Sequence, residues 1–183
     1  MAEEYLKSVT CQFEYYKKIA DRTFEQLSEE QLHWQYDEES NSIATIIKHM
    51  AGNMLSRWTD FLTTDGEKDW RDRESEFDNC QRDRVTLLAK WNEGWSCLFT
   101  ALDSLSEDDL DSIIYIRNQR QSAMDAICRQ LAHYSYHVGQ IVFIGKMVLG
   151  EQWNSLSIPR GRSNEFNNEK FSNPKQETFS EET

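Results

Sequence analysis

The sequence predicts an all-α fold, a four-helix bundle, from three observations. Apolar residues recur at helical spacing, helix-breaking residues are scarce, and the apolar pattern divides into four long segments. The two prolines in the chain, Pro159 and Pro174, both lie near its C-terminal end, so nothing before them forces a helix to break. Long helices that each carry one apolar stripe bury these stripes against one another in a bundle.

The first two predicted helices lie in the N-terminal third of the chain. The first extends from about Glu3 to Leu27, and Ser28–Gln31 then has the sequence of a capping box. The second helix begins near Ser42 and ends before Thr63. Its apolar stripe consists of Ile43, Ile46, Ile47, Met50, Met54, Trp58 and Phe61.

The other two predicted helices follow a polar connection, Glu67–Cys80. The third extends from about Gln81 to Leu105, and the fourth from about Ser122 to Leu149. Between them, Ile113–Ile116 has the pattern of a brief extended crossing rather than of a strand in a sheet. The stripe of the third helix comprises Val85, Leu88, Trp91, Trp95, Leu98 and Leu102. The longer connections between helices two and three and between three and four permit a topology other than simple up-and-down.

The domain organisation is predicted from the change in composition near the end of the fourth helix. Residues 1–153 form the bundle and residues 154–183 an irregular tail. Within the tail, Ser155–Phe166 contains enough apolar side chains to fold back over the bundle, whereas the last dozen residues have the polar composition of disordered chain.

Charge and hydropathy exclude several function classes. Twenty basic residues against 32 acidic ones give a net charge of −12, which argues against binding of nucleic acid backbones. No stretch reaches the ~18 apolar residues of a membrane span, and the start Met1–Glu4 lacks the pattern of a signal peptide. We therefore expect a cytoplasmic protein with neither nucleic acid nor membrane as a partner.

The four cysteines are far apart and include no CxxC pair, so the sequence contains neither a zinc ribbon nor a thioredoxin-type site. Cys11, Cys97 and Cys128 fall among helical apolar residues and are predicted to be small side chains in or near the core.

The histidines form the most informative pattern. His133 and His137 are four residues apart on the fourth predicted helix, so they project about 40° apart and about 6 Å along its axis. Two imidazoles so placed can chelate one metal ion, although two rim histidines bonded to neighbouring groups would give the same pattern. A catalytic site of this type needs a third protein ligand, and His49, near the buried stripe of the second helix, is the natural candidate. His33 lies beside Trp34 in a connection and is predicted to be a surface or packing residue.

Two segments resemble a known family. The sequence IKHMAG at Ile47–Gly52, with its histidine 84 residues before the first histidine of LAHYSYHVGQI at Leu131–Ile141, is similar to the DinB/YfiT-like family of metal-dependent enzymes. Residues around Arg57, Thr63–Lys68 and Ser157–Gly161 resemble a bacterial subgroup of that family, and the resemblance covers residues 1 to 166.

The resemblance implies a four-helix bundle that holds a metal ion through three histidines, which correspond here to His49, His133 and His137. It also implies a homodimer and a bound nickel or zinc ion. Neutral imidazole ligands favour nickel, copper or zinc over manganese, and they also suit iron(II).

Three functions fit such a site. The ion can activate water for hydrolysis, or hold a small-molecule thiol of the bacillithiol type as a thiolate for S-transfer. The third possibility is a metal-stabilised stress-response bundle without turnover. The helix that carries His49 would also present Asn53 and Arg57, one and two turns further on, either to orient a small-molecule substrate or as ordinary polar groups on the helix surface.

Other polar residues are assigned less directly. Arg160 and Arg162 in the tail are candidates to close over an anionic substrate, with a solvated loop as the alternative. Tyr134 and Tyr136 are predicted to pack within the bundle rather than to act as acid–base groups.

Overall fold

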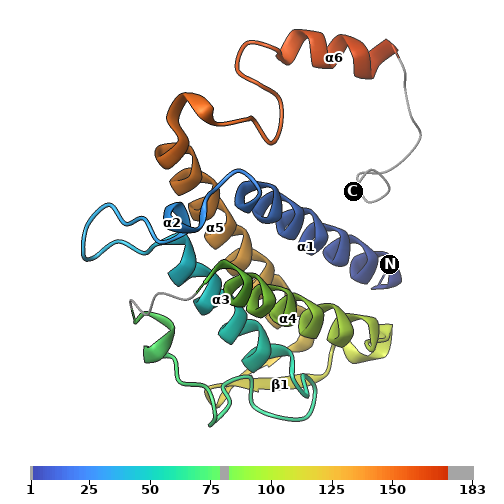
Figure 1. Ribbon diagram of the computed structural model, residues 1–183. Coiled ribbons are helices and arrows are strands. Elements are labelled where there is room, and N and C mark those ends of the chain that lie inside the picture. The colour runs from blue at the N-terminus through green and yellow to red at the C-terminus, as the bar shows by residue number, and fades with distance from the viewer. Residues whose placement is uncertain (1, 79–82, 173–183) are drawn as a thin grey trace.

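The fold is mostly helical, with one small sheet. The computed structural model describes residues 2–78 and 83–172. Four long helices make up most of this part of the chain (Figure 1): α1 (Ala2–Phe24), α3 (Ile43–Trp58), α4 (Arg84–Asp103) and α5 (Ala123–Leu149). None of the described helices is both long and apolar enough to cross a membrane.

Short elements connect or follow the long helices. They are α2 (Glu29–Leu32), η1 (Glu74–Glu76), η2 (Glu107–Asp109), β1 (Ile113–Ile116), β2 (Gln119–Ser122), η3 (Gly150–Gln152) and α6 (Ser163–Ser172).

The helix starts follow from local capping chemistry. The side-chain oxygens of Ser42, Asp83 and Ser122 each accept a hydrogen bond from the backbone N–H three residues on, at the starts of α3, α4 and α5. Each cap pairs one of the backbone donors that a helix leaves unpaired in its first turn. The predicted capping box at Ser28 is present and starts α2.

The four long helices pack in pairs. Helix α3 packs chiefly on α4 and α1 on α5, while contacts of α3 with α5 and of α1 with α4 join the two pairs. At the centre, the fully buried ring of Phe13 on α1 lies edge-on to Trp58 of α3 and Trp95 of α4, with Tyr134 of α5 5.9 Å away. The core therefore takes side chains from all four helices.

The apolar stripes predict the core with one clear exception. Every predicted stripe residue of α3 is buried, together with Phe61 just beyond that helix. Val85 is 78 % exposed instead, because it lies on the side of α4 that faces away from the buried Leu87 and Trp91. Cys128 is also exposed rather than near the core, whereas Cys11 is buried, and Cys80 lies outside the described residues.

The extended crossing at Ile113–Ile116 is in fact a strand, and this prediction was wrong. It pairs with β2 in an antiparallel hairpin in which Ile113 lies opposite Ser122. Arg117 and Asn118 form the turn with positive φ angles of 52° and 60°, and both their backbone N–H groups donate to the carboxylate of Asp65 at 2.8 Å. A residue distant in sequence thus stabilises a turn that usually calls for glycine.

The tail also differs from the prediction of an irregular segment. Residues 163–172 form α6, which has no buried residue and stands away from the long helices (Figure 1). The expected return of Ser155–Phe166 over the helices is limited to its start, where Arg22 donates to the backbone oxygen of Leu156 at 2.9 Å. Nearly all of the last dozen residues lie outside the described part of the chain.

Candidate metal centre

Three histidines from two helices meet at one side of the core. His49 comes from α3, and His133 and His137 come from successive turns of α5. Each offers a ring nitrogen, and these three atoms lie within 4.8 Å of one another. The three residues selected from the sequence therefore form one group that could hold a metal ion.

Two hydrogen bonds orient the imidazoles from outside the group. His49 Nδ1 lies 2.9 Å from Glu76 Oε2, and His137 Nδ1 lies 2.8 Å from Gln140 Oε1. Both oxygens are hydrogen-bond acceptors, so both imidazole rings carry their proton on Nδ1. The Nε2 atom of each ring then has a free lone pair that can bind a metal ion. Metal-binding histidines are oriented in this way by carboxylates and carbonyl oxygens in many proteins.

The distances fit a shared ion. His133 Nε2 and His137 Nε2 are 3.0 Å apart. Two nitrogens that are each about 2.1 Å from one zinc-like ion have a separation close to this value when the angle at the ion is about 90°. The ring centres of His49 and His137 are 5.0 Å apart, so the imidazole of His49 also lies beside the position that such an ion would occupy. The donor set of three neutral imidazoles suits nickel, zinc or iron(II).

Burial keeps the two histidines on α5 neutral. Burial chiefly, with the neighbouring His137 and His49 next, lowers the pKa of His133 from 6.5 to about 3. Burial also lowers the pKa of His137, although its bond to Gln140 acts in the opposite direction. A metal ion must displace any proton on the ligand nitrogen, so a low pKa favours metal binding at neutral pH.

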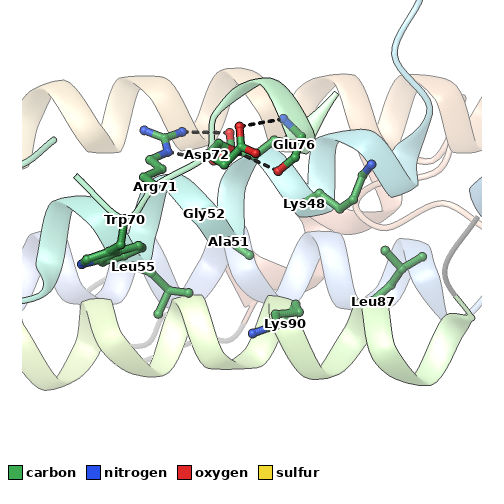
Figure 2. A pocket seen from close by; sticks show the side chains of 11 residues that line it. Lys48, Ala51, Gly52, Leu55, Trp70, Arg71, Asp72, Glu76, Leu87 and Lys90 are labelled. Carbon is green, nitrogen blue, oxygen red and sulfur yellow. Dashed lines mark hydrogen bonds and ion pairs between the residues drawn. The ribbon is translucent and has the colours of Figure 1, made fainter. Parts of the chain in front are cut away.

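A buried ion pair fixes the carboxylate behind His49. Arg71 holds Glu76 through two hydrogen bonds, Nε to Oε1 at 2.7 Å and Nη2 to Oε2 at 2.9 Å (Figure 2). Burial alone would raise the pKa of Glu76, but the bonds to His49 and Arg71 outweigh it and lower the pKa. Glu76 is therefore ionised, and the two hydrogen bonds from one guanidinium group to its two oxygens limit its movement.

Gly52 makes room for this carboxylate. Figure 2 shows Gly52 on α3 beneath the loop that carries Arg71 and Glu76. A Cβ atom at position 52 would lie 2.2 Å from Glu76 Oε1, which is closer than any real contact. The absence of a side chain at this position thus lets the loop approach the helix one turn beyond His49.

Glu76, Arg71 and Gln140 were not predicted as site residues from the sequence. Glu76 and Arg71 lie in the connection between α3 and α4, where charged residues are dense and no periodicity separates buried from exposed positions. Gln140 is three residues after His137, a spacing at which helical side chains meet, and this was a usable signal.

The two substrate-orienting candidates take part in internal contacts. Arg57 is buried, and its Nη1 donates to the backbone oxygen of Gly66 and, at 3.0 Å, to Glu67. Asn53 accepts a hydrogen bond from Tyr134 at 2.9 Å through Oδ1. Both residues still line a cavity beside His49 and His133.

The remaining candidates lie outside the group. His33 is not among the clustered histidines, and Arg160 and Arg162 are exposed on the tail. Tyr134 is fully buried as predicted. Tyr136 is 61 % exposed, because it lies two residues further on and therefore on the side of α5 opposite to Tyr134.

The sequence matches the model of a protein family over most of its length. No curated protein matches the sequence. A family model described as "Protein of unknown function (DUF1572)" matches residues 1–162, which include every residue of the histidine group and its supporting contacts. The chain belongs to this family.

Proposed function

We propose that the chain is a metal-dependent enzyme of the DinB/YfiT-like kind that hydrolyses a small-molecule substrate. In this proposal His49, His133 and His137 hold one divalent ion, nickel or zinc in the first place and iron as the alternative. The observation that carries it is the pair of outer contacts, Glu76 on His49 and Gln140 on His137, because they aim both Nε2 atoms at one point.

The arrangement of the helices supports the proposed relationship to the DinB/YfiT-like family. The contacts of α3 with α4, α1 with α5, α3 with α5 and α1 with α4 form a closed circuit of four helices. This is the arrangement of a four-helix bundle, which places facing side chains of two helices around a site in its interior. We infer that the fold is a four-helix bundle, with the hairpin and α6 as additions.

A divalent ion in such a site lowers the pKa of a coordinated water or thiol, which supplies a nucleophile near neutral pH. The protein's own contribution is orientation: Glu76 and Gln140 fix two rings, and Arg71 fixes Glu76. Among the described residues the group has three members, and no fourth histidine, cysteine, aspartate or glutamate belongs to it. An open position of this kind is typical of a catalytic rather than a structural site, which favours an enzyme over a metal-stabilised bundle without turnover.

A metal-dependent thiol S-transferase is the second candidate, and one observation favours it. The described residues that line the cavity beside His49 and His133 include neither a carboxylate nor a thiol. Hydrolysis of an amide or ester gains from a protein acid that protonates the leaving group, whereas attack by a thiolate needs no such group. The cavity would then hold a low-molecular-weight thiol.

Metal content tests the site. Mass spectrometry of the freshly purified protein is expected to find about one nickel, zinc or iron ion per chain. His137→Ala should lose this ion, whereas His33→Ala, a matched change outside the group, should keep it. A wild-type protein that contains no ion and takes up none of the three when each is added would refute the proposal.

Spectroscopy and turnover distinguish the candidates. In a cobalt-substituted protein, a low-molecular-weight thiol should shift the visible spectrum if the enzyme is an S-transferase. Ester or amide turnover that is lost in His137→Ala and needs no thiol would indicate a hydrolase. If chelation lowers the melting temperature sharply and neither turnover is detected, the metal serves structure alone.

A further inference from the structure

A basic cavity adjoins the histidine group. Its volume is about 250 Å³, and it opens beside His49 and His133. Five arginines line it from four parts of the chain: Arg57, Arg71, Arg73, Arg117 and Arg129. Such a concentration of guanidinium groups stands out in a chain with a net charge of −12.

Two carboxylates neutralise only part of this charge. Glu67 contacts three of the guanidinium groups, those of Arg57 at 3.0 Å, Arg117 at 3.3 Å and Arg71 at 3.5 Å. Burial alone would raise the pKa of Glu67, but these arginines outweigh it and lower the pKa, so the carboxylate is ionised. Glu76 is committed to Arg71 and His49. Neither acidic residue lines the cavity, whose described lining consists of these five arginines together with two histidines and two side-chain amides.

Arg73 and Arg129 are the guanidinium groups least engaged by the protein. Arg73 lies over the ring of Phe77 and meets Glu74, whose side chain is 90 % exposed, at 3.5 Å. Arg129 is exposed on α5, and among the described residues its guanidinium makes no hydrogen bond or ion pair. Each of the two keeps the donors that a bidentate contact with an oxyanion requires.

Gln130 supplies an independent sign of a ligand. It is 4 % exposed, lines the same cavity, and its Oε1 atom has no hydrogen-bond partner. A buried amide oxygen without a donor is unfavourable, and native proteins pair nearly all such atoms. A ligand with an O–H or N–H group in the cavity would satisfy it.

We propose that this arginine-lined cavity binds the oxyanion of a small acidic substrate, a carboxylate or a phosphate. Arg73 and Arg129 contact the oxyanion, Gln130 accepts a hydrogen bond from a hydroxyl or amide of the same molecule, and the reacting group lies beside His49 and His133. The cavity is smaller than the roughly 300–1,000 Å³ of sites for drug-sized ligands, so the substrate is a small acid. The inference rests on the proposed function for the reaction but not for binding.

Calorimetric titration of the full-length protein with succinate, inorganic phosphate and the neutral succinamide tests the charge requirement. We expect succinate or phosphate to bind at least tenfold more tightly than succinamide, and the tighter of the two identifies the oxyanion. Arg129→Gln should weaken this binding at least fivefold. Arg120→Gln, which removes an exposed arginine from β2 outside the cavity, should leave it unchanged. Circular dichroism checks that both variants are folded.

Malate tests the role of Gln130, because it adds one hydroxyl to succinate. Wild-type protein should prefer malate, and Gln130→Met should bind the two acids equally. The proposal is overturned if neither succinate nor phosphate binds more tightly than succinamide, or if the binding survives Arg129→Gln unchanged. Metal content is measured on the same samples: metal without oxyanion binding refutes this inference alone, and oxyanion binding without metal refutes the proposed function alone.

Discussion

Glu76 Oε2 lies 2.9 Å from His49 Nδ1, so the loop between α3 and α4 is hydrogen-bonded to the histidine group through one buried carboxylate. Among the described residues that carboxylate contacts no other histidine of the group, and its other hydrogen bonds come from Arg71. Glu76 is therefore a positioning residue. It acts on a bound metal ion through His49. The effect of substituting Glu76 therefore measures how much the orientation of the His49 ring contributes to metal binding.

Glu76→Gln is expected to reduce metal affinity by about 10–100-fold while the fold persists, because outer partners of metal-binding histidines contribute in this range. Glutamine retains an oxygen that can accept from His49 but loses the charge that pairs with Arg71. Competition with a chromophoric chelator measures the affinity. Glu74→Gln, a change two residues away at an exposed side chain, is the control and should have no effect. Equal affinities in both variants would show that Glu76 does not position His49.

Gly52→Ala is expected to weaken both the metal site and the fold. Alanine is favoured over glycine in a helix by about 0.8–1.0 kcal/mol, but here its Cβ would overlap Glu76 Oε1. Chelator competition should show a loss of affinity like that of Glu76→Gln, and urea denaturation should show a lower free energy of unfolding than that of the wild type.

Gly139→Ala is the matched control for this change. Gly139 lies within α5, and a Cβ there meets nothing within 4 Å. Alanine at this position should raise the free energy of unfolding by up to about 1 kcal/mol. If Gly52→Ala gives the same gain, the loop can move away from α3 without cost and the close packing at Glu76 has no function.

The metal-free protein should lose stability as the pH falls below about 6.5. The pKa of His133 is 6.5 when unfolded and about 3 when folded, so between these values the unfolded chain binds a proton that the folded chain does not. Acid therefore favours unfolding across this window, and the lowered pKa of His137 acts in the same direction. Glu76 stabilises the fold at neutral pH, and this contribution is lost only as the pH falls below about its ordinary pKa of 4.5, because its folded pKa is lower still.

Urea denaturation at pH 7.5 and pH 5.5 in the presence of a chelator measures this dependence, since the lower pH is a full unit above the ordinary pKa of Glu76, 4.5, and its carboxyl stays largely ionised. His133→Gln should reduce the difference between the two pH values. A wild-type protein that is equally stable at both would show that the buried histidines titrate normally in the folded state.

Much of the helical fold could be predicted from local chemistry. The stripe of α3 identifies a fully buried face, and Ser28, Ser42 and Ser122 each start a helix as side-chain caps do. His133 and His137 were recognisable because a spacing of four residues fixes their relative direction on any helix. These features depend on residues close together in the sequence.

The parts that were missed depend on contacts between distant segments. The hairpin turn at Arg117 and Asn118 is stabilised by Asp65, and β2, with the sequence QRQS, contributes no apolar side chain that would mark it as a strand. Glu76 likewise becomes part of the site only because Arg71 and Gly52 bring the loop against α3. No periodic pattern in the sequence encodes such contacts.

Tyr134→Phe tests a buried chain of hydrogen bonds between the core and the candidate site. Trp58 Nε1 donates to the Tyr134 hydroxyl at 3.1 Å, and this hydroxyl donates to Asn53 Oδ1 at 2.9 Å. Removing the hydroxyl leaves a donor and an acceptor unpaired, and each buried unpaired group costs about 1–3 kcal/mol. We expect the free energy of unfolding to fall by at least about 1 kcal/mol in urea denaturation.

Tyr115→Phe, at a tyrosine that is 45 % exposed on β1, is the control for Tyr134→Phe and should change stability by less than about 0.5 kcal/mol. Because Asn53 lines the basic cavity, Tyr134→Phe should also weaken succinate binding if the tyrosine holds the amide in place. A loss of stability with unchanged succinate binding would assign the hydrogen-bond chain to the core alone. Unchanged stability would mean that Trp58 and Asn53 find other partners once the hydroxyl is removed.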